Sequence, residues 1–251
     1  MVSITLYHGS ENVIQKPLFH AGNPKNDYGY GFYCTESIEL AKEWASSEEK
    51  DGFANQYTLN MAGLLVLNLS DGKYNILNWL AILLQNRTFS ITSDIAIDAA
   101  AYISENFLVQ YEQFDIIRGY RADDSYFAFA NAFLNNTISL KKLNKAMYLG
   151  KLGEQIVLKS KKAFSRIKYV SSVAADRSVY YPQKMNRDSA ARKAFFEMRS
   201  SGSVSAKTGA TGAASSATIA SSAAANDIFV MDILRGGFKN DDPRIPAVLF
   251  E

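Results

Sequence analysis

Residues 27–35 read DYGYGFYCT, and this stretch decides the fold that we expect for the chain. Glycine alternates with large aromatic side chains across it, as in a strand that another segment approaches closely. Glycine leaves room for that segment because it carries no side chain. We therefore expect a strand over residues 28–33, with Asp27 ordering the glycine turn.

The segments on either side of this stretch predict a strand and a helix. Residues 3–8 alternate weakly between apolar and polar side chains and lead into a His-Gly-Ser turn, which is typical of a short strand. After the aromatic stretch, Thr35 is expected to cap a helix that ends near Ser46. Its apolar face would consist of Leu40, Ala41, Trp44 and Ala45.

The rest of the chain alternates between strand-like and helix-like patterns. Apolar runs and β-branched residues predict strands over residues 61–69, 114–120, 155–158 and 167–170, with a turn at 163–164. Apolar residues that recur at three and four positions predict helical segments over residues 73–110, 125–134, 140–149 and 187–199. Residues 228–234 fit a strand or a helix, and residues 240–245 read as polar turns.

One tract departs from this pattern. All of residues 200–225 except Val204, Lys207 and Ile219 are Ala, Ser, Gly or Thr. Such side chains bury too little surface to offset the entropy that is lost when the tract becomes ordered. The tract is therefore interpreted as a flexible linker or a replaced loop. An Ala-rich helix over residues 213–225 is the competing interpretation. We found no internal repeat.

The composition excludes several classes of protein. A single cysteine among 251 residues, Cys34, excludes a disulfide scaffold and a Cys-rich zinc module. With only two histidines a mechanism without metal is expected, and magnesium held by carboxylates is the alternative. A formal charge of +2 does not identify a partner. Neither a signal peptide nor a membrane-length apolar run is recognisable, so we expect a cytoplasmic protein without a membrane partner.

Three separated segments together resemble the ADP-ribosyltransferase fold of the diphtheria-toxin and poly(ADP-ribose)-polymerase type. That family places a His, a Tyr and a Glu on three strands, and the matching positions here are His8, Tyr33 and Glu154. Trp44 stands eleven residues after Tyr33, where a second aromatic residue is common in the family. The resemblance implies an α+β fold, a split β-sandwich with a helical insertion, in which residues 1–199 and 226–251 form a single domain.

The chain is also similar to a bacterial family catalogued as a domain of unknown function. The shared motifs are YHGS at residues 7–10, the aromatic-glycine stretch at 27–35, GYRADDSYF at 119–127 and DDPRI at 241–245. Within the last motif, we expect Asp242, Pro243 and Arg244 to tie the chain end to the core rather than to form a site.

The resemblance to ADP-ribosyltransferases also implies roles for individual residues. Glu154 would be the catalytic carboxylate beside the ribose of NAD, with His8 on the other ribose. Tyr33 and Trp44 would hold the nicotinamide ring between them. The backbone of Gly9 would meet the carboxamide, and Ser10 and Gly31 complete the expected NAD-binding set. One departure is Ala41, which stands where polymerase-type members carry a serine.

Two points stay open at this stage. Adjacent residues of a strand face opposite sides, so either Glu154 or Gln155 enters the cleft, and an inward Gln155 would favour binding of NAD with poor catalysis. Arg121, Asp123 and Asp124 are either a contact to the acceptor or to the pyrophosphate, or simply the start of a helix.

The expected activity is transfer of ADP-ribose from NAD to a macromolecular acceptor, in a toxin of a toxin–antitoxin or phage-defence system with a neutralising partner. The alternatives are an NAD glycohydrolase that uses the same site, and a catalytically silent module that binds NAD or ADP-ribose.

Overall fold

The structure is a computed structural model that describes residues 2–122, 124–149, 153–200 and 227–245. Its strands form two sheets. The three-stranded sheet is antiparallel, and its strands in spatial order are β1 (Ser3–Ser10), β3 (Gly52–Asn60) and β7 (Ile167–Ala175). The four-stranded sheet has the order β2 (Phe32–Cys34), β6 (Glu154–Leu158), β5 (Ile116–Tyr120) and β4 (Val66–Asn68), with only β4 and β5 parallel. Two packed sheets with separate helices make this an α+β protein.

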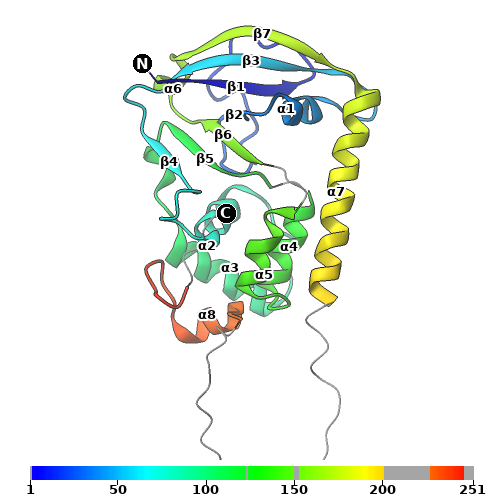
Figure 1. The fold of residues 1–251 in the computed structure, drawn as a ribbon. Helices are drawn as coiled ribbons and strands as arrows, with labels where there is room; N and C mark the ends of the chain where they lie inside the picture. The colour runs from blue at the N-terminus through cyan, green and yellow to red at the C-terminus, as the bar shows by residue number, and fades with distance from the viewer. Residues whose placement is uncertain (1, 123, 150–152, 201–226, 246–251) are drawn as a thin grey trace, which may run out of the picture.

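The two sheets enclose a small hydrophobic core. The three-stranded sheet contributes Leu6, Tyr57 and Leu59, all fully buried, and the four-stranded sheet contributes Ile156 and Leu158. Side chains on a strand alternate between its faces, so only every second residue of β6 belongs to this core. The other face of β6 is turned toward the helices (Figure 1).

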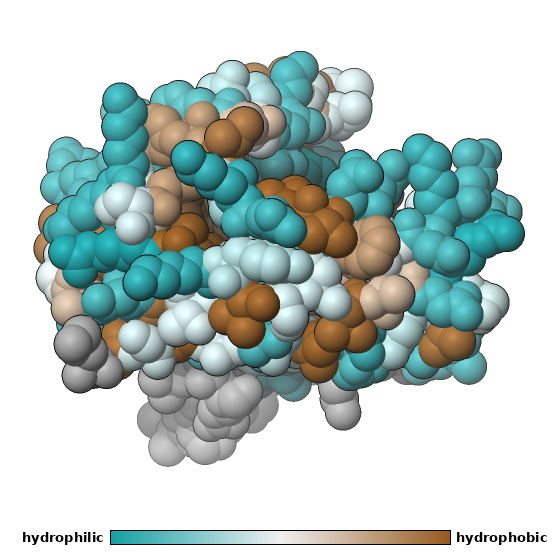
Figure 2. All heavy atoms as spheres, turned by 90° about the horizontal axis from the view of Figure 1, so that it is seen from above, coloured by the Kyte–Doolittle hydropathy of each residue, from teal (hydrophilic) through white to brown (hydrophobic). Residues whose placement is uncertain are grey.

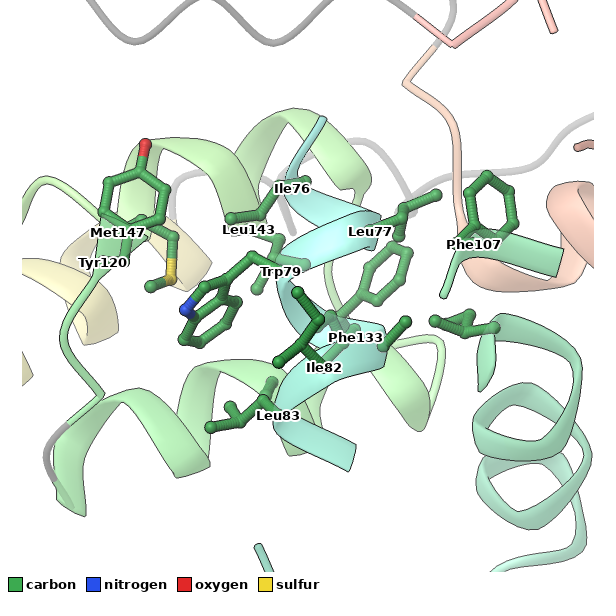
Figure 3. Packing of buried hydrophobic residues seen from close by; sticks show 14 of the residues in the cluster. Ile76, Leu77, Trp79, Ile82, Leu83, Phe107, Tyr120, Phe133, Leu143 and Met147 are labelled. Carbon is green, nitrogen blue, oxygen red and sulfur yellow. The ribbon is translucent and has the colours of Figure 1, made fainter. Parts of the chain in front are cut away.

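Helices cover that other face and form the larger core. They are α2 (Ile76–Asn86), α3 (Asp94–Phe107), α4 (Asp124–Leu134), α5 (Leu140–Ala146) and α8 (Val230–Gly236), with the short 3-10 helix η1 (Tyr111–Gln113). Trp79 of α2 lies at the centre of this core, near Tyr120, Leu143 and Met147 (Figure 3). Val157 of β6 belongs to the same cluster, so the sheet and the helices share one core.

The remaining helices lie at the edges of the sheets. Helix α1 (Ile38–Ala45) packs against β1 and β3, and α6 (Lys161–Phe164) precedes β7. The long α7 (Arg177–Ser200) starts beside the three-stranded sheet and runs down to α4 and α5 (Figure 1). Seen from the side of the three-stranded sheet, the surface mixes hydrophilic and hydrophobic residues in small patches (Figure 2). Within the described residues no helix is both long and apolar enough to cross a membrane.

The structure corrects several predicted strands. The stretch 28–33 is a strand only over Phe32–Cys34, because Gly29 adopts a left-handed φ of 71° that ends regular extension. Of residues 61–69, only Val66–Asn68 pair with another strand. The preceding residues form a turn, in which the Leu64 amide donates a hydrogen bond to the Met61 carbonyl. Strand β3 was not predicted at all, and β7 extends five residues beyond the predicted end at residue 170.

The helix boundaries also differ from prediction in places. Ser37, rather than Thr35, caps α1 by accepting from the Leu40 amide, because Thr35 is already held in a bridge to Tyr7. Helix α7 begins ten residues before the predicted start at 187 and contains Pro182, which the amphipathic pattern did not anticipate. Residues 163–164, predicted as a turn, end the short helix α6, and Val230–Gly236 form a helix, which is one of the two predicted alternatives for that segment.

Near the chain end, Asn240 accepts from the Asn78 amide and Ile245 is buried in the larger core, whereas Arg244 bonds locally, to Asp242 and to the Gly236 carbonyl. The interpretation of the Ala/Ser/Gly/Thr tract lies outside the described residues beyond Ser200.

Candidate functional site

A cavity of about 240 Å³ lies where β1, β2, β6 and α1 meet the end of α2 and the loop before α4. Its lining brings together residues that are far apart in the sequence. They are His8, Gly9, Asn26, Asp27, Tyr33, Trp44, Arg87, Arg121, Ala122 and Gln155. Three strands therefore each contribute a polar side chain to one space.

The imidazole of His8 is held in one orientation. Its Nδ1 lies 2.7 Å from the carbonyl oxygen of Tyr33, and its ring stacks on Phe32 with the centroids 4.3 Å apart. A carbonyl only accepts, so Nδ1 must carry the hydrogen. Burial lowers the pKa of His8, which favours the neutral ring. The neutral ring with a protonated Nδ1 keeps Nε2 as a hydrogen-bond acceptor.

Gln155 and Asp27 form the polar floor of the cavity. Gln155 is 3 % exposed, and its Nε2 donates to Asp27 Oδ2 at 2.7 Å and to the Tyr120 carbonyl at 2.9 Å. Asp27 Oδ2 also accepts from the Ala122 amide at 2.9 Å. Both hydrogens of the Gln155 amide are thereby used, which leaves Oε1 as the acceptor that Gln155 offers to the cavity.

The charge of Asp27 is only partly balanced by its neighbours. Arg87 Nη1 lies 3.4 Å from Asp27 Oδ1, and this buried oxygen accepts no hydrogen bond from the described residues. Burial raises the pKa of Asp27, while its hydrogen bonds and the nearby guanidinium groups oppose that rise. Asp27 thus links the turn before β2, the end of α2 and strand β6 around one carboxyl group.

Tyr33 serves the turn as well as the cavity. Its hydroxyl accepts from the Tyr28 amide at 3.0 Å and donates to the Gly29 carbonyl at 2.7 Å. The left-handed φ of Gly29 makes this closure of the turn possible without a side-chain clash. Burial raises the pKa of the Tyr33 hydroxyl well above its ordinary value, so it stays protonated.

The opposite side of the cavity is aromatic and cationic. The guanidinium carbon of Arg121 lies 4.2 Å from the centre of the Trp44 ring, a cation–π contact. Trp44 Nε1 is buried and makes no hydrogen bond within the described residues. Among the described residues that line the cavity, Arg87 and Arg121 carry guanidinium groups and Asp27 carries a carboxylate. This excess of positive charge suits an anionic group of a ligand.

Gly9 has a structural role that the sequence did not reveal. A β-carbon at this position would overlap the backbone of Ala41 and approach the amide nitrogen of Ala45. The absence of a side chain therefore lets α1 pack directly on β1. This close packing places Trp44, the residue before Ala45, beside His8 and Gly9 at the cavity.

Glu154 lies on the other face of β6. Its carboxylate accepts from Arg118 Nε at 2.5 Å, and Arg118 Nη2 lies 2.9 Å from Glu36. Glu154 does not line the cavity, whereas Gln155 does. The expected place of Glu154 in the cleft is therefore taken by Gln155, because the alternation along the strand admits only one of the two side chains.

Other predicted site residues lie elsewhere. Ser10 donates to the Asn12 carbonyl and accepts from Asn55 Nδ2, outside the cavity lining. A β-carbon on Gly31 would meet Val157, so this glycine serves the packing of the turn against β6. Asp124 begins α4, and Asp123 lies outside the described residues.

The cavity also contains residues that the sequence did not single out as site residues. Arg87 follows the end of α2, where a C-terminal cation is ordinary, and Asn26 and Ala122 carry no motif of their own. Asp27 was expected only to order the glycine turn. The position of Asp27 at the start of the aromatic-glycine stretch is the one sequence signal that could have placed it in the cavity.

Comparison with known families identifies one match. The profile of a family described as "Protein of unknown function (DUF3990)" matches residues 4–169, which is more than half of the chain. The chain belongs to this family. The DUF3990 match contains every residue that lines the cavity and ends before α7. No curated protein and no solved structure showed a significant match.

Proposed function

We propose that the cavity binds NAD and that the chain transfers ADP-ribose from NAD to a macromolecular acceptor. The observation that carries this proposal is the convergence of His8, Tyr33, Trp44 and Gln155 on one cavity from β1, β2, α1 and β6. Together with Arg87 and Arg121, these groups match the chemical parts of the dinucleotide. The acceptors His8 Nε2 and Gln155 Oε1 suit ribose hydroxyls, and the arginines suit the pyrophosphate.

The nicotinamide ring would lie against Tyr33 and Trp44. Nicotinamide in NAD is a flat cation, and aromatic faces attract flat cations by stacking and by the ring quadrupole. Arg121 lies over Trp44 in the structure, so its guanidinium would move toward the phosphates when the ring enters. The same residue would then serve the anionic half of the ligand.

The chemistry requires stabilisation of positive charge on a ribose. The bond between C1′ and the nicotinamide nitrogen breaks with its electron pair leaving on nicotinamide, and the acceptor then forms a bond to C1′ and loses a proton. Groups that stabilise the intervening positive charge accelerate the reaction if they act more strongly there than on bound NAD. Gln155 Oε1 supplies a neutral acceptor, and Asp27 lies one hydrogen bond behind it. That charge-assisted bond polarises the Gln155 amide and makes Oε1 more negative.

A second candidate has its own support. Gln155, a neutral group, stands where the resemblance implies a carboxylate, and a neutral acceptor stabilises an oxocarbenium-like charge less strongly. A module that binds NAD or ADP-ribose without turnover fits that observation. The two candidates share the cavity and differ only in whether NAD is consumed.

Incubation of the purified chain with NAD labelled in its adenosine half and with a whole-cell lysate tests the proposal. We expect NAD to be consumed and labelled macromolecules to be found by mass spectrometry. Free ADP-ribose alone would indicate a glycohydrolase, and bound but unconsumed NAD would indicate the silent module. If NAD is neither bound nor consumed, the proposal is wrong.

A matched pair of neighbouring residues sharpens this test. Gln155→Ala should abolish labelling, whereas Glu154→Gln should retain it, because only Gln155 reaches the cavity. The opposite result would mean that the face of β6 has been assigned incorrectly. Gln155→Glu reports on the second candidate, since a gain of turnover in this variant would show that the neutral group limits catalysis.

The proposed setting is a bacterial toxin that acts in the cytoplasm and is held inactive by an antitoxin protein. Only the resemblance to bacterial ADP-ribosyltransferases supports this setting. Induced expression in a bacterial host should arrest growth, and the Gln155→Ala variant should not. Growth that is equal with both proteins would argue against a toxin.

A further inference from the structure

Helix α7 contacts both α1 and α4, which lie next to the cavity, although it lies outside the DUF3990 match. Trp44 of the cavity lies on α1, and Arg121 and Ala122 come just before α4, with the Arg121 guanidinium against the Trp44 ring. Figure 1 shows α7 running from the level of α1 to the level of α4 and α5. A rigid helix that contacts both α1 and α4 can set their separation.

The contact with α1 is an ion pair between the partly exposed Arg187 and the buried Glu43. Arg187 Nε donates to Glu43 Oε2 at 3.0 Å, and Nη2 donates to Oε1 at 2.7 Å. Glu43 is only 2 % exposed. Two parallel bonds from a planar guanidinium to a carboxylate fix direction as well as distance. Glu43 directly precedes Trp44 in α1, so its carboxylate orients the helix beside the cavity.

Two further contacts hold α7 in place. Near its start, the Tyr180 hydroxyl accepts from Lys42 Nζ at 2.9 Å. Near its end, Phe195 packs on Phe129 of α4 with the ring centroids 4.1 Å apart, and both rings are buried. The Arg187–Glu43 pair therefore lies between two anchored points of the same helix.

We propose that Arg187 is a positioning residue: through Glu43 it sets the place of Trp44, so that α7 completes the cavity from outside the family match. Without the guanidinium, Glu43 would be a buried carboxylate with no compensating charge. Helix α1 would have to turn or shift to hydrate it, and Trp44 would move with the helix. For its effect on NAD binding, this inference rests on the proposed function.

Fluorine NMR of the full chain labelled with 5-fluorotryptophan measures the position of Trp44 without any ligand. The protein has two tryptophans, Trp44 and Trp79, so two resonances are expected, and Trp44→Phe assigns them. Arg187→Met should shift or broaden the Trp44 resonance and leave that of Trp79 in place. Arg192→Met is the matched control, since Arg192 lies on α7 and pairs with Asp188 of the same helix.

NAD titration of the same variants provides the second readout. We expect Arg187→Met to weaken binding about tenfold, the scale expected when a contact group is misplaced, and Arg192→Met to leave it unchanged. Arg187→Lys keeps the charge but loses the two-pronged geometry, so it should fold and show a smaller shift of Trp44. If Arg187→Met does not fold, the Trp44 resonance of Arg187→Lys tests the inference in its place.

The inference is overturned if Trp44 has the same resonance in the Arg187 variants and in the Arg192 control. A wild-type protein that does not bind NAD would refute the proposed function instead, because the NMR measurement needs no ligand. A shifted Trp44 with unchanged NAD affinity would also overturn the inference, since Arg187 would then not act on the cavity.

Discussion

Replacing Gln155 with methionine should destabilise the protein by about 3 kcal/mol. Methionine keeps the length of the side chain but removes both hydrogen-bond donors. The bond to Asp27 Oδ2, at 2.7 Å, has a charged acceptor and is worth roughly 1.5–3 kcal/mol, and the bond to the Tyr120 carbonyl, at 2.9 Å, is worth roughly 0.5–1.5 kcal/mol. Gln155 is buried, so water cannot easily replace either donor.

Urea unfolding followed by far-ultraviolet circular dichroism measures this loss. Gln110→Met is the matched control, because Gln110 is exposed, and it should change the free energy of unfolding by less than about 0.5 kcal/mol. Asp27→Ala removes the same bond from the other side. The double variant should therefore lose less than the sum of the two single losses, by about 2 kcal/mol.

Two results would refute the reasoning about this pair. A loss in Gln155→Met as small as that of the exposed control would mean that the Gln155 amide is not bonded as described. Additive losses in the double variant would mean that Asp27 and Gln155 do not interact, and the polarised acceptor of the proposed mechanism would then have no basis.

Three other changes have predictable outcomes. Gly9→Ala should cost about 3 kcal/mol or more in a thermal melt, because its β-carbon would overlap the backbone of Ala41; an unchanged melting temperature would contradict the close packing of α1 on β1. Burial lowers the pKa of His8 because it favours the neutral ring. The stability that the buried neutral ring contributes is therefore complete above the ordinary pKa of 6.5 and is lost as the pH falls toward the lowered pKa. The His8→Gln variant should not show this loss of stability in unfolding curves measured between about pH 7 and pH 5. If the stability of the wild type and of the variant depends on pH in the same way, His8 is not buried as a neutral ring. Lys159→Met should release the carbonyl of Tyr30, which accepts from Lys159 Nζ at 2.8 Å, and so speed hydrogen exchange across residues 28–33 by about tenfold; unchanged exchange would show that the turn does not depend on this lysine.

Local patterns predicted much of the fold. The apolar runs around residues 116–120 and 155–158 are strands, and the periodic segments around Trp79 and Ile103 are helices. These patterns are readable because each element buries one side of itself. The strand-borne His8 and Tyr33, and Trp44 on its helix, also meet at one cavity, as the resemblance to ADP-ribosyltransferases implied.

Strand β3 shows why other elements escaped prediction. Its sequence, GFANQYTLN, includes the fully buried Asn55, which a pattern of apolar residues does not anticipate. Asn55 is buried because its amide donates to the carbonyls of His8 and Asn12 and its oxygen accepts from the Ile14 amide. A buried polar side chain that hydrogen-bonds the backbone of a distant loop can be recognised only when the position of that loop in the fold is known.

The aromatic-glycine stretch at residues 27–35 by itself predicted a strand and a close approach by another segment, but the left-handed φ of Gly29, which confines the strand to Phe32–Cys34, emerged only from the structure. It could not determine which residue of β6 would meet that turn. Pairing of β5 with β6 sets Gly119 opposite Gln155, and the lack of a side chain on Gly119 admits the hydroxyl of Tyr28 beside them.

Side chains on a strand alternate with a period of two residues, so a shift by one residue would exchange Gln155 for Glu154 in the cavity. Only the tertiary structure decides that choice, because it depends on which face of β6 is packed against Asp27 rather than on any property of the two neighbouring residues.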